Sequence, residues 1–462
     1  MPRRCIPILL AVSPALGTPT PELGKLTADD PFDYALLADT CDLRGPLALL
    51  GASGVPFFDA PGGAYLFDVS TRTQLAKFDL PSTIPHKQEV VGVALAEHRA
   101  YIGTITDTLP GYRSLVRLFD ISTPSSPALL RSIVPSDVGF DDAFGQAMCA
   151  DGATTLIAAP ADEIDGAFSG SVHIFDTDTG DELGKCTPTD AETGDQFGFS
   201  LDLDASLAIV GARWEDELGH RAGAAYLFDI SDPASPVQTA KLLGSSVEAD
   251  DMFGFSVAID GSLAIVGAIF DDDNGFDAGA VYVFDISDPA NPVETAKIIT
   301  SDGASGEDIG WDVSLEGTTA LITGRTVHTL FPGGGGAYVY DLSDPANPVE
   351  RCRIAPADGH NNQLFGWSAD LDADTALIGA VQDDAHAVNA GAAYLFDLST
   401  GPSPCNPADL ADPLGALDFS DVIAFLTAFG AMSPAADLAP PTGVFDFSDV
   451  LAFLAAFGAG CP

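Results

Sequence analysis

The sequence predicts an all-β fold built from seven copies of one unit, and two observations carry that prediction. A phrase of small residues followed by an aromatic strand and an Asp recurs at intervals of 52 to 56 residues. Each copy also contains four short strand-like runs, with Gly, Pro, Asn and Asp at their boundaries. Four strands in a unit of about 50 residues, repeated in series, are the outline of a β-propeller. The phrase ends at Asp68, Asp120, Asp176, Asp229, Asp285, Asp341 and Asp397.

The fifth copy shows the four expected strands most clearly. "FGFSVAID" (253–260) alternates large and small residues, and "SLAIVGA" (262–268) is a short apolar run. "AGAVYVFDIS" (278–287) is aromatic and β-branched, and "VETAKII" (293–299) closes the unit. Period-two patterns of this length favour strands over helices.

The chain ends predict how the ring closes. After Asp397 the chain reads "LSTGPSPC", so the last blade lacks its fourth strand. "ELGKL" at residue 22 parallels "ELGKC" at residue 182, which closes the third unit. Residues 22–27 are therefore expected to form the outer strand of the last blade, which would leave no open sheet edge.

One basic residue recurs in the outer strand of every unit. The column has two interpretations: a ring of cations that binds an anionic ligand, or lysines that protect the strand edge and pair with nearby acids. The second is favoured. The column consists of Lys25, Lys77, Arg131, Lys185, Lys241, Lys297 and Arg353.

The repeated phrase also resembles a known family. "DMFGFSVAIDGSLAIVGA" (251–268) followed by "GAVYVFD" (279–285) is similar to the FG-GAP repeat of integrin α-chain propellers and bacterial surface proteins. The resemblance covers residues 20–400 and implies a propeller with an adhesive role. Turns such as "SDPANP" (287–292) resemble those of LVIVD-type repeats. The family's calcium loop is shortened here to "IDGS" (259–262), too short to wrap a calcium ion, so those sites are not carried over.

The charge balance limits the partners. The chain has 67 acidic and 19 basic residues, for a net charge of −48. Such a chain repels phosphate, so nucleic acid is not an expected partner. Divalent cations, basic surfaces or a salty habitat suit it better. No apolar run of about 18 residues follows the N-terminus, so no membrane span is expected.

The long loops that share one face of the predicted ring hold the best metal candidate in the propeller. "DDDNGFD" offers Asp271, Asp273 and Asp277 as hard oxygen donors, with Gly275 for a sharp turn. The alternative is a solvated acidic loop. His220, His328 and His386 also fall in long loops, but scattered histidines of this kind are common. No nucleophile, phosphate-loop or zinc-protease motif occurs, so an enzyme is not expected.

Beyond residue 400 the pattern changes to a duplicated loop and amphipathic helix, 409–430 and 437–458. It resembles a dockerin module of the type that ends in Gly-Cys, here Gly460-Cys461. The resemblance implies Ca²⁺ in both loops and a cohesin-like or envelope receptor as partner. Each loop has one extra residue, and prolines replace middle ligands in the second. Cys405 and Cys461 bracket this small module and are expected to form a disulfide. The implied ligands are Asp409, Asp412, Asp418, Asp421, Asp437, Asp446 and Asp449.

These features predict three parts: a signal peptide (1–19), a seven-bladed β-propeller (20–400) closed by an N-terminal strand, and a small α-helical dockerin-like module (401–462). The expected function is that of a secreted or cell-surface adhesion protein, which binds an extracellular protein or polysaccharide through its acidic face. The alternatives are a polysaccharide-active enzyme and a structural component of an envelope or matrix.

Overall fold

A computed structural model describes most of the chain between residues 22 and 399, together with Val450. The residues left out within that range are 32, 55–61, 79, 81–87, 109–110, 136, 138, 140–141, 165–166, 301–302, 328–332, 385–386. The compact unit that carries the fold comprises Pro21–Glu350 and Ile354–Ser399. The predicted signal peptide, the tail aspartates and the Cys405–Cys461 disulfide lie outside the described residues, so they stay predictions.

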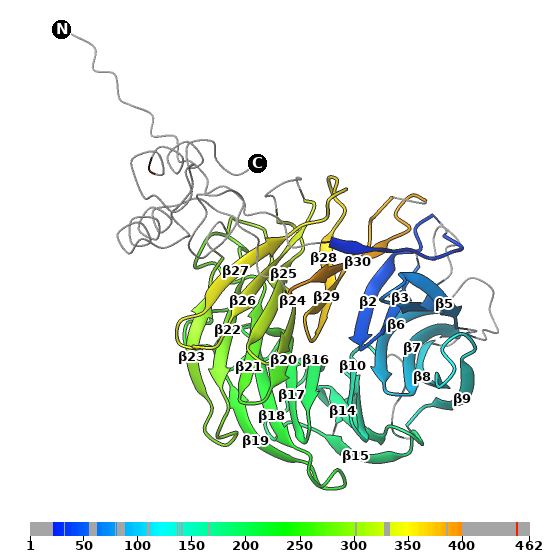
Figure 1. Ribbon diagram of the computed structural model, residues 1–462. Helices are drawn as coiled ribbons and strands as arrows, with labels where there is room; N and C mark the ends of the chain where they lie inside the picture. The colour runs from blue at the N-terminus through cyan, green and yellow to red at the C-terminus, as the bar shows by residue number, and fades with distance from the viewer. Residues whose placement is uncertain are drawn as a thin grey trace, which may run out of the picture. The chain divides into compact units, whose positions relative to one another are not determined.

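Seven four-stranded sheets form a ring, and every regular element in the described part of the propeller is a strand (Figure 1). Blade one has β2 (Leu37–Arg44), β3 (Leu47–Ala52), β4 (Gly63–Asp68) and β5 (Thr73–Lys77). Blade two has β6 (Gln88–Ala96), β7 (Arg99–Thr108), β8 (Gly111–Asp120) and β9 (Ala128–Ile133). Blade three has β10 (Met148–Asp151), β11 (Thr154–Ala159), β14 (Ser171–Asp176) and β15 (Glu182–Cys186). A hairpin, β12 (Glu163–Ile164) and β13 (Ala167–Phe168), lies between β11 and β14.

The remaining blades follow the same order along the chain. Blade four has β16 (Phe197–Asp204), β17 (Leu207–Ala212), β18 (Ala224–Asp229) and β19 (Val237–Leu242). Blade five has β20 (Phe253–Asp260), β21 (Leu263–Ala268), β22 (Ala280–Asp285) and β23 (Val293–Ile298). Blade six has β24 (Ile309–Glu316), β25 (Thr319–Gly324), β26 (Gly336–Asp341) and β27 (Val349–Ile354). Blade seven has β28 (Phe365–Asp372), β29 (Thr375–Ala380), β30 (Ala392–Asp397) and the N-terminal β1 (Glu22–Leu26).

The last blade is closed by the first strand of the chain, as predicted. β1 pairs antiparallel with β30, with Lys25 opposite Tyr394 and Leu26 opposite Ala393. Leu26 is fully buried in the cluster that blades seven and one share. The first and last strands of the propeller, which are more than 360 residues apart in the sequence, are thus joined in one sheet.

Two glycines of the repeat allow neighbouring blades to touch. Gly223 has φ +86 and forms a bridge with Phe253 of the next blade. A Cβ atom on Gly223 would lie 2.0 Å from the Phe253 carbonyl oxygen, and one on Gly254 would lie 2.2 Å from the Ala224 oxygen. No larger residue fits either position. The recurring Phe-Gly and Gly-Ala pairs therefore mark the places where one blade's backbone meets the next.

The phenylalanine of the same motif fills the blade interior. Phe253 packs edge-on against Tyr282 and Phe284, with ring centroids 5.3 and 6.1 Å apart. All three side chains are at most 3% exposed. Phe197 and Phe365 make the same two contacts in blades four and seven. Burial of these large rings, with their edge-to-face geometry, explains why the phrase repeats with so little change.

No helix in the described part of the chain is long and apolar enough to span a membrane.

The closing strand yields a direct test. Leu26→Ala should lower the free energy of unfolding by about 2–5 kcal/mol, because Leu26 is 0% exposed in the core. Leu23→Ala in the same strand should change it by about 0.5 kcal/mol or less, because Leu23 is 37% exposed. Urea unfolding of both variants measures the difference. Equal, small effects would show that β1 is not part of the ring.

Candidate functional site

The acidic loop predicted to bind metal already holds a cation from the protein itself. Lys297 Nζ lies 2.6 Å from Asp271 Oδ2, 2.5 Å from Asp273 Oδ2 and 3.0 Å from Ser246 Oγ. It also lies 5.0 Å from the centre of the Tyr282 ring, and the Tyr282 hydroxyl donates to Asp271 at 2.9 Å. The side chains of Lys297 and Asp271 are 14% and 2% exposed. The ammonium group therefore neutralises the loop from within.

The third predicted ligand lies apart from this cluster. The backbone N–H of Asp277 donates to Asp272 Oδ1 at 2.7 Å, while its own carboxylate has a pKa raised by partial burial and by Asp272. Among the described residues, Asp271, Asp273 and Asp277 are not one of the groups whose donor atoms converge within 4.8 Å. Calcium in this loop stays a prediction, and any ion that binds there must displace Lys297.

The same ammonium-centred cluster recurs around the ring, and it joins three elements each time. The lysine comes from the outer strand, one acid from the loop between the second and third strands, and another from the loop that enters the blade. The pairs are Lys25 with Asp383 and Asp358, Lys185 with Asp162 and Asp137, and Lys241 with Glu215 and Asp190. Lys77 also pairs with Asp30, and Arg131 pairs with Asp181. The predicted pairing of the basic column with nearby acids is confirmed for these residues.

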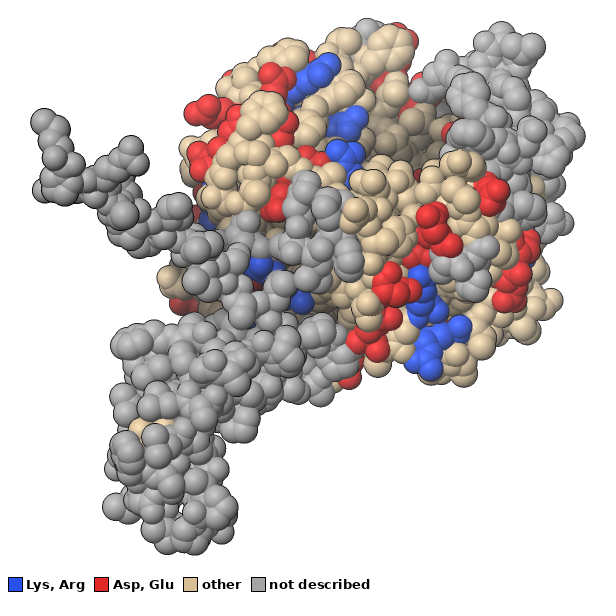
Figure 2. Space-filling model, turned by 90° about the horizontal axis from the view of Figure 1, so that it is seen from above, with Lys and Arg blue, Asp and Glu red and all other residues tan. Residues whose placement is uncertain are grey.

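These contacts favour the protonated, charged form of the lysines. Burial alone would lower the pKa of Lys241, but its hydrogen bonds to Asp190, Glu215 and Glu217 raise the pKa above its usual value. Lys185 and Lys297 are raised in the same way. Each lysine therefore stays charged and keeps its loops fixed. Figure 2 shows the charged side chains on one side of the molecule, where the basic ones are fewer and have acidic ones near them.

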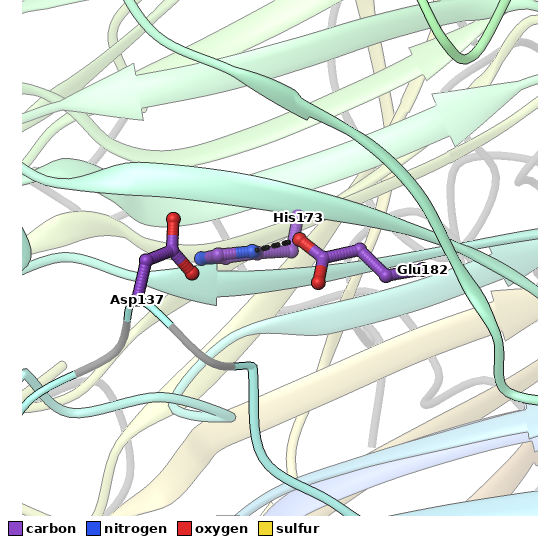
Figure 3. A group of neighbouring side chains, drawn as sticks. All are labelled: Asp137, His173 and Glu182. Atoms are coloured by element: carbon purple, nitrogen blue, oxygen red, sulfur yellow. Dashed lines mark hydrogen bonds and ion pairs between the residues drawn. The ribbon is translucent and has the colours of Figure 1, made fainter.

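Blade three departs from this pattern with a histidine (Figure 3). His173 occupies the position of Tyr226 and Tyr282 and is fully buried. Its Nδ1 lies 2.8 Å from Glu182 Oε1 and its Nε2 lies 3.3 Å from Ser171 Oγ. Burial lowers the pKa of His173, which favours the neutral ring.

Asp137, His173 and Glu182 bring their donor atoms within 4.8 Å of one another, and the donor types suit a divalent transition metal. Lys185, however, lies 2.9 Å from Asp137 and already neutralises it. The second such group, Asp190, Glu215 and Glu217, likewise surrounds Lys241. We therefore assign neither group a metal. Sequence reasoning missed His173, because a single exception to a column carries no repeat pattern.

The first strands of the blades line a central cavity of about 500 Å³. Carboxylates on its walls join one blade to the next, among them Asp42, Asp202, Asp312 and Asp370. Asp202 accepts hydrogen bonds from Leu203 N at 2.8 Å and from Ile259 N of the next blade at 2.9 Å. Asp312 and Asp370 repeat this arrangement, and Asp42 accepts from Leu95 N of blade two at 2.7 Å.

Burial perturbs these carboxyl groups strongly. It raises the pKa of Asp42 and Asp202 to about 6 and that of Asp312 to about 7, against the hydrogen bonds from backbone N–H groups that lower it. The pKa of Asp370 is also well above its usual value, first because of burial and then because of Asp42. Backbone donors bind these oxygens, so the perturbed acids serve as links between blades.

A row of aromatic side chains, which we call the aromatic arc, lies where the first strands of blades four to seven begin. It consists of Phe199, Phe255, Trp311 and Trp367, all half-buried. Neighbouring ring centroids lie 5.1, 4.9 and 5.0 Å apart, with interplanar angles of 51°, 46° and 46°. The near-constant tilt follows the rotation from blade to blade. Sequence reasoning missed the arc, although the residue after each Phe-Gly or Ile-Gly pair marks it.

Two arginines cover part of the aromatic arc. The Arg213 guanidinium lies 3.5 Å from the centre of the Phe199 ring, and that of Arg325 lies 4.2 Å from the Trp311 ring. Trp311 donates its indole N–H to the Trp367 carbonyl at 2.9 Å, which fixes the ring. The arc is therefore a rigid aromatic surface, on the same face as the lysine-bound loops.

Comparison with known proteins finds the repeat itself. A profile described as "FG-GAP repeat" matches residues 130–175, 181–228, 236–284, 292–340 and 349–396, which together exceed half of the chain. The "LVIVD repeat" matches residues 269–300. No curated protein matches the chain. A solved structure titled as a hypothetical selenium-binding protein from Sulfolobus tokodaii is similar, at 12% identity and a TM-score of 0.45; the match covers 69% of this chain and 79% of that one.

The lysine clusters predict a large difference between two members of one column. Lys297→Met should lower the free energy of unfolding by about 3–5 kcal/mol, because it leaves the buried Asp271 without its cation. Lys77→Met should cost about 0–1 kcal/mol, because Lys77 and Asp30 are 39% and 45% exposed. Chemical unfolding of both variants tests this. Similar losses would mean that burial of the pair does not matter.

The buried carboxyl groups of the central cavity predict an unusual pH dependence of stability. An Asp in the unfolded chain titrates near 3.9, so the folded protein binds extra protons between about pH 4 and the raised pKa values near 6 and 7. The free energy of unfolding should therefore rise as the pH falls from 7.5 to 5. Asp312→Asn removes one titrating group and should flatten this slope. Urea unfolding across the range measures both. A stability that falls steadily towards pH 5 would contradict the prediction.

Proposed function

Because the chain belongs to the FG-GAP repeat family, we propose that it is an exported binding protein whose propeller holds an extracellular protein or polysaccharide on its long-loop face. The observation that carries this proposal is the aromatic arc. Four large rings there are only partly buried, although the blade cores are already filled by other aromatic residues. Partly buried aromatic side chains with fixed geometry are typical of binding sites.

The loops around the arc support the same role. Lysines hold the acids of these loops in blades three, four, five and seven, so little ordering is needed when a ligand binds. A rigid scaffold with positioned loops is a common design for recognition. This is a binding role, and we propose no catalysis for the protein.

The other parts of the proposal rest on sequence alone. Residues 1–19 would direct export, and the dockerin-like tail, residues 401–462, would attach the protein to a cohesin-like or envelope receptor. Ca²⁺ in the duplicated loops of the tail would fold that module.

The alternative is a polysaccharide-active enzyme. It would have to use the carboxyl groups of the central cavity, such as Asp202 and Asp312, whose raised pKa values suit a general acid or base. Backbone N–H groups bind both oxygens of Asp202 and of Asp312, so their geometry suits structure better than proton transfer. We therefore favour the binding role.

The proposal predicts saturable binding to at least one envelope or matrix ligand. The full chain would be tested against a panel of such polysaccharides and proteins, first with calcium and then with a chelator. Binding that survives chelation is expected, because the loops of the binding face carry their own ammonium groups. Binding lost on chelation would instead favour a metal, either at Asp271 and Asp273 or in the loops of the tail, and no binding to any ligand would favour a structural component.

A further inference from the structure

Two arginines of blade four share one aromatic ring. Arg213 follows β17 and Arg221 precedes β18, so both belong to the same loop. Their guanidinium carbons lie 4.9 and 4.7 Å from the centre of the Trp214 ring. Two guanidinium groups thus contact one ring, on a chain whose net charge is −48.

Neither guanidinium has a carboxylate within ion-pair distance among the described residues, which sets these arginines apart. Arg213 donates from Nε to the amide oxygen of Gln196 at 2.7 Å. At the equivalent position of blade six, Arg325 pairs with Asp308 at 2.7 Å. A half-buried pair of like charges without a counterion is costly, and a bound anion would remove that cost.

The acids nearest in the sequence are already engaged elsewhere. Glu215 and Glu217 bind Lys241 at 2.8 and 2.7 Å, Asp216 Oδ1 accepts the backbone N–H of Arg221 at 2.6 Å, and Asp250 lies 2.9 Å from His220 Nδ1. Neither guanidinium is among the groups that these carboxylates bind.

Trp214 adds a donor that has no acceptor among the described residues. Its indole Nε1 is buried and has no hydrogen-bond partner among the described residues. A buried N–H without a hydrogen-bond partner is uncommon in folded proteins, because most buried polar groups are paired. Arg213, Arg221 and Trp214 together offer donors only, so the missing partner is an acceptor with negative charge.

The cluster continues directly into the aromatic arc. Arg213 stacks on Phe199 at 3.5 Å and lies 5.5 Å from the Phe255 ring centre. A ligand whose anionic group contacts Arg213 would therefore have its neighbouring part beside the rings of the aromatic arc. A sugar ring with a carboxylate combines a planar anion for the guanidinium fork with an apolar C–H face for the aromatic surface.

We propose that Arg213, Trp214 and Arg221 form a subsite for the carboxylate of an acidic polysaccharide, with the sugar ring packed on the aromatic arc. This inference rests on the binding function proposed above and specifies its ligand class. The charge of the rest of the protein does not prevent such binding, because exposed charges beyond about 8 Å are largely screened at physiological salt.

The test is calorimetric titration of the full chain at physiological salt with a hexuronate oligosaccharide and with its neutral methyl ester. The acid should bind and the ester should bind at least about tenfold more weakly, since charge-assisted hydrogen bonds are lost. Equal affinity for acid and ester would overturn the inference, as would no binding of the acid.

Substitutions locate the site. Arg213→Met keeps the aliphatic contact with Phe199 but removes the charge, and it should weaken binding at least about tenfold, with partial recovery in Arg213→Lys. Arg99→Met is the control away from the arc; it should change affinity less than about threefold, because Arg99 is already paired with Asp178 at 3.1 Å. Arg221→Met replaces Arg213→Met if that variant does not fold. Equal losses in the Arg213 and Arg99 variants would overturn the assignment.

Two outcomes separate this inference from the proposed function. If a panel ligand binds and Arg213→Met has no effect, the binding role stands and the carboxylate subsite is wrong. If an acidic peptide such as polyglutamate binds through Arg213 while the hexuronate does not, the site recognises anions of proteins and the saccharide assignment is overturned.

Discussion

The pairing of β1 with β30 is the constraint on which the rest of the structure depends. Each blade leans on the next through a glycine bridge, as between Gly223 and Phe253, and through a carboxylate such as Asp202. These contacts form a complete circle only because the N-terminal strand supplies the last blade's missing edge. At the junction with blade one, Asp370 of blade seven accepts the Leu43 N–H, and Gly391 of blade seven forms a bridge with Leu37. An open ring would leave the outer edge of β30 unpaired and the loops of one face without a fixed frame.

On this frame the protein uses its own ammonium groups where a metal ion is expected. Lys185 and Lys241 each bind acids from two separate loops, and Lys297 in blade five binds two acids of one loop and the Ser246 hydroxyl of another. A lysine brings one charge and a tethered position, so the loops are fixed without any added ion. The large excess of acid therefore has a structural use in part, since the first acid of each loop is buried against a lysine. The face that remains is acidic, rigid and marked by one aromatic arc.

The sequence allowed the ring, the number of blades and the closing strand to be predicted, because each follows from a pattern that repeats seven times. The lysine column was predictable for the same reason, and its favoured interpretation is confirmed where ion pairs are seen. The binding features were not predictable. His173 replaces a tyrosine once, and Arg213, Trp214 and Arg221 occur in one loop only. Their meaning depends on how a loop folds against its neighbours, and a single sequence carries no periodic record of that. Asp271, Asp273 and Asp277 were equally good ligand candidates in the sequence, yet only Asp271 and Asp273 pair with Lys297.

Hydrogen exchange of the full chain, followed peptide by peptide, tests the closure of the ring most directly. If β1 completes blade seven, amides of residues 22–26 should be as strongly protected as those of β19, the outer strand of blade four. Residues 22–26 exchanging as fast as an exposed loop, while β19 stays protected, would show that the ring is open. The fixed binding face inferred from its closure would then be wrong.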